Sequence, residues 1–133
     1  MKSKRKVLCV CARGRNRSRY LAQYLRRKGY STRAGGVEPF ADPDRPWNPI
    51  SQKKVDWADL IVVVEERVLP ILKKDYNVKG KKIIAFTVID APKWIPDEFA
   101  ELRKLPKKEF NKVWTYPRLR KAIEEHLPLE GVK

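Results

Sequence analysis

Residues 7–18 have the sequence VLCVCARGRNRS, in which a short apolar run ends at Cys11 and is followed by Arg17 and Ser18. The run at residues 6–10 predicts a buried strand, because it is short and apolar on both faces, as in a parallel sheet. The spacing Cys-x5-Arg-Ser indicates a loop that binds a phosphate group and also supplies the nucleophile that attacks it. In such a loop backbone N–H groups surround the phosphoryl oxygens, and a guanidinium binds two of them.

A cysteine in this position needs help to ionise, because a free thiol is mostly protonated at neutral pH. A loop that leads into a helix N-terminus points N–H groups and the positive end of the helix dipole at the sulfur. Arg13, Arg15 and Arg17 add positive charge nearby, and Ser18 can donate a hydrogen bond to the thiolate. We therefore expect Cys11 to be the nucleophile, Arg17 to bind the phosphoryl oxygens and Ser18 to stabilise the thiolate.

The rest of the loop is expected to surround the phosphate. Its phosphate-binding residues are predicted to be Ala12, Arg13, Gly14, Arg15, Asn16 and Arg17. Gly14 permits the positive φ that an inward-folding loop often needs. Cys9 lies inside the predicted strand, so its expected role is core packing. The alternative interpretation is that Cys11 is an ordinary buried residue and that residues 13–19 form a basic surface cluster.

Strands and helices alternate along the remaining chain. Strands are expected at residues 6–10, 30–34, 60–64 and 82–86, and helices at residues 19–28, 51–58, 65–76, 97–105 and 117–127. This alternation predicts one α/β domain over residues 1–133, with a parallel sheet covered by helices on both faces in three layers. Residues 37–50 hold four prolines and are expected to form a loop.

The chain is strongly basic, with 31 Lys and Arg against 16 Asp and Glu, for a net charge of +15. Residues 1–37 contain 12 of the basic residues, and the first acidic residue is Glu38. A positive field of this kind attracts anionic ligands to the loop. It is equally compatible with a polyanion such as RNA, or with a basic surface that only keeps the protein soluble.

Several classes of site are excluded by composition. Cys9 and Cys11 are the only cysteines and are one residue apart, which excludes a disulfide framework. His126 is the only histidine, so we expect no zinc or other metal site, and nothing indicates a cofactor. No apolar run is long enough to span a bilayer or to form a signal-peptide core, so we expect a cytoplasmic protein without membrane contact. The oligomeric state is not indicated.

The loop and its place after the first strand resemble the low-molecular-weight protein tyrosine phosphatases. Within that superfamily the chain is most similar to a branch of predicted phosphatases with three motifs: Cys-x-Arg-x-Arg/Lys-x-Arg-Ser, Trp-Ala-Asp-Leu-Ile and Asp-x-Pro. These motifs match Cys11–Ser18, residues 57–61 and residues 90–92. The resemblance implies a flavodoxin-like, four-stranded parallel sheet with strand order 2-1-3-4. The chain departs from the family at Gly14, where relatives commonly have an asparagine that helps to hold the loop, and at Arg19, which is often proline.

Cleavage of a phosphomonoester also needs an acid for the leaving group and a base for water. The resemblance places that carboxyl in the loop after the last strand. Asp90 is the first candidate because it directly follows the strand, and Asp97 is the alternative, although it could simply cap the next helix. Trp94 and Trp47 are candidates for lining the substrate site, but each could also be a hydrophobic plug.

These features together predict a phosphomonoester hydrolase that acts through a phosphocysteine, with a phosphorylated protein, and phosphotyrosine in particular, as the expected substrate. Another phosphomonoester is the alternative within this class. A different class of function is nucleic-acid or nucleotide-phosphate binding, with or without dephosphorylation of that ligand. Arsenate reduction is a third alternative, disfavoured because it usually needs further cysteines and none follows Cys11.

Overall fold

Four parallel strands form the centre of the structure, a computed structural model that describes residues 5–14, 16–38 and 48–129. The strands are β1 (Lys6–Cys11), β2 (Ser31–Gly36), β3 (Leu60–Val63) and β4 (Lys82–Ala85). Their order in the sheet is β2-β1-β3-β4, as expected from the family resemblance. The two strands in the middle, β1 and β3, are almost wholly buried, because helices cover both faces of the sheet.

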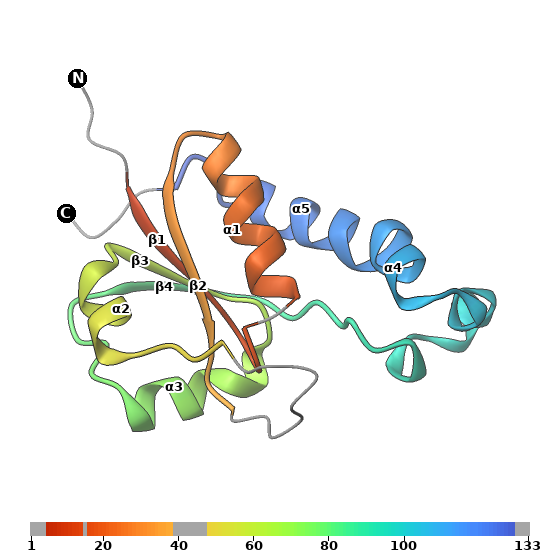
Figure 1. The fold of residues 1–133 in the computed structure, drawn as a ribbon, viewed down its shortest axis with the longest axis horizontal. Coiled ribbons are helices and arrows are strands. Elements are labelled where there is room, and N and C mark those ends of the chain that lie inside the picture. The colour runs from red at the N-terminus through yellow and green to blue at the C-terminus, as the bar shows by residue number, and fades with distance from the viewer. Residues whose placement is uncertain (1–4, 15, 39–47, 130–133) are drawn as a thin grey trace.

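Helices lie on both faces of the sheet, so the chain forms the predicted three layers (Figure 1). One face packs against α1 (Arg17–Arg27) and α5 (Tyr116–Glu124), which contribute Leu21, Leu25, Leu119 and Ile123 to the core. The other face packs against α2 (Gln52–Trp57) and α3 (Leu69–Asp75), which contribute Val55 and Leu72. Alternate residues of β1 face these two layers, as the two-residue period of a strand requires.

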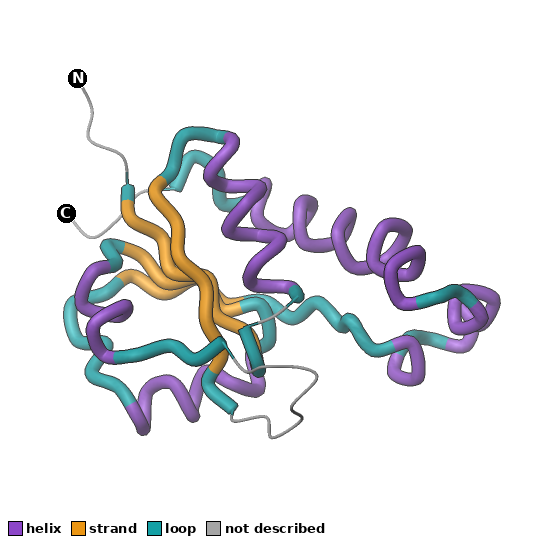
Figure 2. The backbone as a smooth tube through the Cα atoms, in the orientation of Figure 1, coloured by secondary structure: helices purple, strands orange, loops and turns teal. Residues whose placement is uncertain are grey.

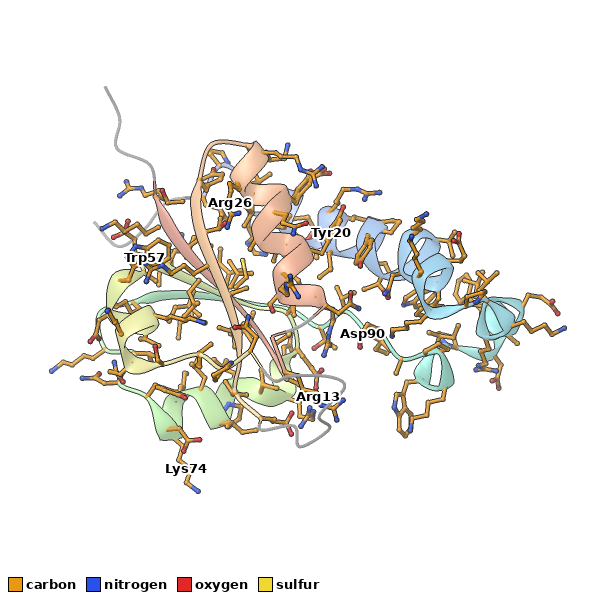
Figure 3. All side chains as sticks on the ribbon, viewed as in Figure 1. Arg13, Tyr20, Arg26, Trp57, Lys74 and Asp90 are labelled. Carbon is orange, nitrogen blue, oxygen red and sulfur yellow. The ribbon has the colours of Figure 1, made fainter. Side chains whose placement is uncertain are left out.

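The register of the sheet brings the ends of its strands together. Cys11 pairs with Gly36 on β2, and Val10 pairs with Val63 on β3. Because all strands run in the same direction, the loops that follow them meet at one edge of the sheet, where open α/β sheets commonly bind ligands. Arg13 and Asp90 lie at this edge, whereas Trp57 lies near the opposite one (Figure 3).

Among the predicted boundaries that differ from the structure, two have a clear physical reason. The second strand continues through Gly35 and Gly36, although glycine usually marks the end of an element, because the loop after β1 packs directly against these two residues. The helix expected at residues 65–76 is divided into a 3₁₀ turn, η1 (Glu66–Val68), and α3. Pro70 lies in the first turn of α3, where the missing N–H of proline costs nothing.

The segment after β4 leaves the sheet and carries a series of short helices before the chain returns as α5 (Figure 2). These are η2 (Pro92–Trp94), η3 (Asp97–Lys104), α4 (Lys107–Phe110) and η4 (Asn111–Thr115). The expected helix at residues 97–105 is a 3₁₀ helix with a kink at Phe99, and no helix was expected at α4 or η4. A small third core of Ile95, Phe110 and Trp114 holds this part together. Within the described ranges, no helix is long and apolar enough to cross a membrane.

Candidate active site

Cys11 ends β1 and is 3% exposed. The following loop turns over the sulfur, so that the Gly14 amide N–H donates to Sγ at 3.1 Å. The thiol donates to Ser18 Oγ, also at 3.1 Å, in the first turn of α1. Because a hydroxyl can rotate, Ser18 can instead donate to a thiolate. An amide and a hydroxyl are therefore available to stabilise negative charge on this sulfur. Arg15 lies outside the described residues.

The loop is packed against β2 with no space for extra atoms. Gly14 has φ +71°, and a Cβ on this residue would lie 2.3 Å from the Asn48 carbonyl oxygen. A Cβ on Gly36 would lie 2.2 Å from the carbonyl carbon of Arg13. The Asn48 side chain donates to the carbonyls of Gly14 at 2.9 Å and of Ala34 at 3.2 Å. Gly14 thus adopts the left-handed conformation without strain. The Asn48 side chain stabilises the loop by joining it to β2.

Arg17 is 7% exposed, and its guanidinium contacts residues that follow β3 and β4. Its Nη1 donates to the Val88 carbonyl at 3.0 Å and is 2.7 Å from Glu65 Oε1. Its Nε is 3.4 Å from Asp90 Oδ2, but the geometry is not that of a hydrogen bond, and this buried N–H has no acceptor among the described residues. One side of the guanidinium is therefore anchored, whereas the buried Nε faces Asp90 without a hydrogen bond.

Glu65 connects this buried arginine to the surface. Its carboxylate also binds Arg67, which in turn is 2.6 Å from Glu38 Oε1. Burial raises the pKa of the Glu65 carboxyl, but the hydrogen bonds and charges of Arg17 and Arg67 lower it by more, so its net pKa is below the usual value. The pKa of Arg67 is raised by its hydrogen bonds to Glu38 and Glu65. Glu65 therefore stays ionised and holds Arg17 in place, a role that sequence analysis did not assign to it.

The structure separates the two candidate acids. Asp90 follows β4 and lines the cavity beside the loop, where Asn16 Nδ2 donates to its Oδ2 at 3.0 Å. Asp97 begins η3, has a side chain 98% exposed, and pairs with Arg103 at 2.9 Å. Of these two carboxylates, only Asp90 contacts residues of the loop, namely Asn16 and Arg17.

Asn16 makes further contacts that sequence analysis missed. Its Oδ1 accepts from the Tyr116 hydroxyl at 2.9 Å, and its Nδ2 also approaches Asn111 Oδ1 at 3.3 Å. Asn111 is buried and begins the π-helix η4, and Tyr116 begins α5. In the sequence, Asn111 is a polar residue in an amphipathic stretch between Pro106 and Pro117. Nothing in that pattern identifies Asn16 as its partner.

An open cavity of about 770 Å³ lies over this edge of the sheet. Ala12, Arg13 and Arg17 of the loop contribute to its wall. Trp94 also lines it and is 67% exposed, with Lys93 Nζ 5.3 Å from the centre of its ring. The cavity therefore offers cations close to the loop and an aromatic surface at its rim. Trp47 lies outside the described residues.

Cys9 has a different environment from Cys11, although only one residue separates them. It is completely buried in the face of the sheet that packs against α1 and α5. Burial raises the pKa of the Cys9 thiol, and the neighbouring Cys11 raises it further. Cys9 is therefore a core residue, as its position in the strand predicted. In the described part of the chain, no three His, Cys, Asp or Glu residues are grouped to hold a metal ion.

Comparison with known proteins finds similarity in structure only, because no family model and no curated protein matches the sequence. The tyrosine phosphatase Wzb from Escherichia coli K30, in complex with phosphate, matches with a TM-score of 0.58 and 18% identity over 92% of this chain and 96% of that one. Vibrio vulnificus Wzb, in complex with benzylphosphonate, matches with a TM-score of 0.60 and 17% identity over 92% of this chain and 97% of that one. The low-molecular-weight protein tyrosine phosphatase from T. tengcongensis matches with a TM-score of 0.55 and 17% identity over 92% of this chain and 97% of that one. This chain therefore has the fold of the low-molecular-weight tyrosine phosphatases.

Proposed function

We propose that this chain is a phosphomonoester hydrolase that works through a phosphocysteine on Cys11. The observation that carries the proposal is the surroundings of one sulfur atom. Cys11 Sγ lies 3.1 Å from both an amide N–H and a hydroxyl, in a loop that lines an open cavity beside a buried arginine. A purely structural cysteine has no need of such partners, whereas a nucleophilic thiolate does.

In the first step the Cys11 thiolate attacks phosphorus, and the S–P bond forms as the bond from phosphorus to the leaving oxygen breaks. The Gly14 N–H and the Ser18 hydroxyl stabilise the thiolate before attack and again when it leaves. Arg17 binds the phosphoryl oxygens through the part of its guanidinium away from Nη1, since Nη1 is already anchored by Val88 and Glu65.

Asp90 serves both halves of the reaction. As an acid it gives its proton to the leaving oxygen, which departs as an alcohol or phenol. As a carboxylate it then takes a proton from the water that attacks the phosphocysteine, so that the S–P bond breaks and inorganic phosphate and the thiolate are released. Its place in the cavity wall, and the exposed position of Asp97, favour this assignment.

The proposed substrate is an aryl phosphate, and phosphotyrosine in a protein in particular. Trp94 supplies an exposed aromatic surface in the cavity wall, against which a phenyl ring can pack. Two of the structural neighbours support the same class, since Wzb from Escherichia coli K30 is a tyrosine phosphatase and Vibrio vulnificus Wzb holds benzylphosphonate.

The alternative functions have less in their favour. Arsenate reduction needs a thiol to resolve the intermediate, and the second cysteine, Cys9, is wholly buried, so an external thiol would have to serve. Nucleic-acid binding rests on the net charge of +15 alone, and Arg67 in the cavity wall is paired with Glu38 and Glu65.

The test is hydrolysis of para-nitrophenyl phosphate by the wild type and by two serine variants. We expect Cys11→Ser to have no measurable activity, because a hydroxyl is not ionised at neutral pH. Cys9→Ser is the matched control, and whatever it costs in stability, the folded protein should retain activity. Activity that survives Cys11→Ser would refute the proposed mechanism.

A further inference from the structure

The Asn16 side chain is held on both sides of its amide. Its oxygen accepts from the Tyr116 hydroxyl at 2.9 Å, and its nitrogen donates to Asp90 Oδ2 at 3.0 Å. Asn111 completes the set, with its Oδ1 3.3 Å from Asn16 Nδ2 and its Nδ2 3.5 Å from Asn16 Oδ1. A residue of the phosphate-binding loop is thus connected to the candidate acid and to two residues about a hundred positions later.

Only one orientation of the Asn16 amide satisfies these neighbours. A carboxylate can only accept hydrogen bonds, so the NH₂ group must face Asp90. If the amide were flipped, its oxygen would face the carboxylate, and both would be acceptors. The Tyr116 hydroxyl favours the correct orientation, because it donates to the amide oxygen on the other side.

The hydrogen bond from Asn16 and the proximity of Arg17 distinguish the two carboxylate oxygens of Asp90. Oδ2 accepts from Asn16 and lies 3.4 Å from Arg17 Nε, so a proton on this oxygen would displace favourable contacts. The transferable proton therefore belongs on Oδ1. We infer that Asn111 and Tyr116 are positioning residues, which hold Asn16 so that it anchors Oδ2 of Asp90 and leaves Oδ1 to exchange the proton with the leaving group. This inference rests on the proposed function.

The two positioning residues are themselves firmly placed. Asn111 is 7% exposed and begins the π-helix, a rare conformation that often occurs at functional sites. The ring of Tyr116 stacks on Tyr20 with centroids 4.0 Å apart. Burial raises the pKa of Tyr116, and the neighbouring Tyr20 and Asp90 raise it further, so the hydroxyl keeps its proton and remains a donor at neutral pH.

The test compares two substrates that differ in their need for an acid. Phenyl phosphate has a poor leaving group and depends on protonation, whereas 2,4-dinitrophenyl phosphate has a good one and does not. We expect Tyr116→Phe and Asn111→Ala each to lower kcat for phenyl phosphate about fivefold, as expected for a weakened hydrogen bond. Hydrolysis of the dinitrophenyl ester should change less than about twofold.

Tyr24→Phe is the matched control, since this tyrosine also belongs to the stack on α1 and donates to Glu124 on α5. It should leave both rates unchanged. A loss in Tyr116→Phe that is equal for the two esters would indicate general structural damage and would overturn the inference, as would no loss at all.

A second readout does not depend on activity. The side-chain NH₂ protons of Asn16, observed by NMR, should exchange slowly with water in the wild type and faster in Tyr116→Phe, but not in Tyr24→Phe. If the wild type hydrolysed neither ester, the proposed function would fail, and this exchange measurement alone would decide whether the positioning contacts exist. Unchanged exchange in Tyr116→Phe would show that Tyr116 does not hold the Asn16 amide.

Discussion

The two halves of the site are held in place in different ways. The loop after β1 packs backbone against backbone, with Gly14 and Gly36 so close to their neighbours that neither can carry a Cβ. The segment after β4 has few regular hydrogen bonds, and side chains from the later helices bind its carbonyls instead. These contacts are Trp114 Nε1 to Ile89 O at 2.9 Å, Lys107 Nζ to Asp90 O, and Arg103 to the carbonyls of Pro92 at 3.2 Å and Ile95 at 2.6 Å.

This difference agrees with the proposed function. A group that binds the phosphate must keep its geometry throughout the reaction, and close backbone packing provides that rigidity. A group that gives and then takes a proton must serve two steps, and side-chain contacts allow small adjustments. We therefore expect changes in the loop after β1, the loop half of the site, to abolish function or folding. Changes in the segment after β4, the acid half, should alter rates in a graded way.

The largest effect on activity, after loss of the nucleophile, is expected for Arg17→Lys. Lysine keeps the charge but cannot bind two phosphoryl oxygens while also reaching Val88 and Glu65. We expect kcat/KM for an aryl phosphate to fall about 10³-fold. Arg19→Lys, on the exposed side of α1, is the control and should be neutral. An active Arg17→Lys enzyme would contradict this account, because it would show that the loop half tolerates substitution.

In the acid half, Asp90→Asn should lower kcat for phenyl phosphate about 10²-fold, since the amide cannot supply a proton. Asp97→Asn should have no effect, because that side chain is exposed and pairs only with Arg103 among the described residues. Measuring both variants with the same ester tests the assignment directly. A larger loss in Asp97→Asn would mean that the acid has been misassigned.

Rigidity of the loop half is tested by Gly14→Ala against Gly80→Ala. Both glycines have positive φ, +71° and +80°, but a Cβ on Gly80 would meet nothing within 4 Å. Strain from φ is common to the two changes, so the additional loss in Gly14→Ala measures the close packing. We expect that additional loss to be about 2 kcal/mol in the free energy of unfolding, measured by denaturant titration. Equal losses would indicate that the loop can move away from β2.

The smallest effect is expected for Trp94→Ala. The side chain is exposed, so unfolding should be unchanged, and loss of the aromatic surface should raise KM for phenyl phosphate about threefold. Methyl phosphate, which has no ring, is the control substrate and should show no change in KM. An equal rise for the two substrates would contradict the role of Trp94 as a surface for the aromatic ring.

The strand, the loop and the helix of the loop half could be predicted from the sequence because their information is local. Cys11, Gly14, Arg17 and Ser18 lie within eight residues, and the strand before them and the helix after them have clear patterns. The acid half was not predictable in the same way. Asp90 and Asp97 are both near the end of β4, and only the path of the 3₁₀ segments, which have no distinct periodicity, separates them.

Other contacts were missed because they join residues far apart in the chain. Asn48 follows a proline-rich stretch whose sequence predicts only a loop, yet its side chain donates a hydrogen bond to the Gly14 carbonyl. Asn111 and Tyr116 reach Asn16 through a π-helix, a conformation with no recognisable sequence pattern. Such contacts depend on tertiary packing, which local propensity does not encode.

The central claim is a covalent phosphoryl group on Cys11, and one measurement tests it most directly. The Asp90→Asn variant is mixed with 2,4-dinitrophenyl phosphate, whose cleavage needs no acid, so that the phosphocysteine forms normally but is hydrolysed slowly. After a denaturing quench, mass spectrometry examines the tryptic peptide of residues 7–13, which contains both cysteines, and fragmentation distinguishes Cys9 from Cys11. We predict one phosphoryl group on Cys11 and none on Cys9. Turnover without a phosphoryl group on Cys11 would contradict the mechanism.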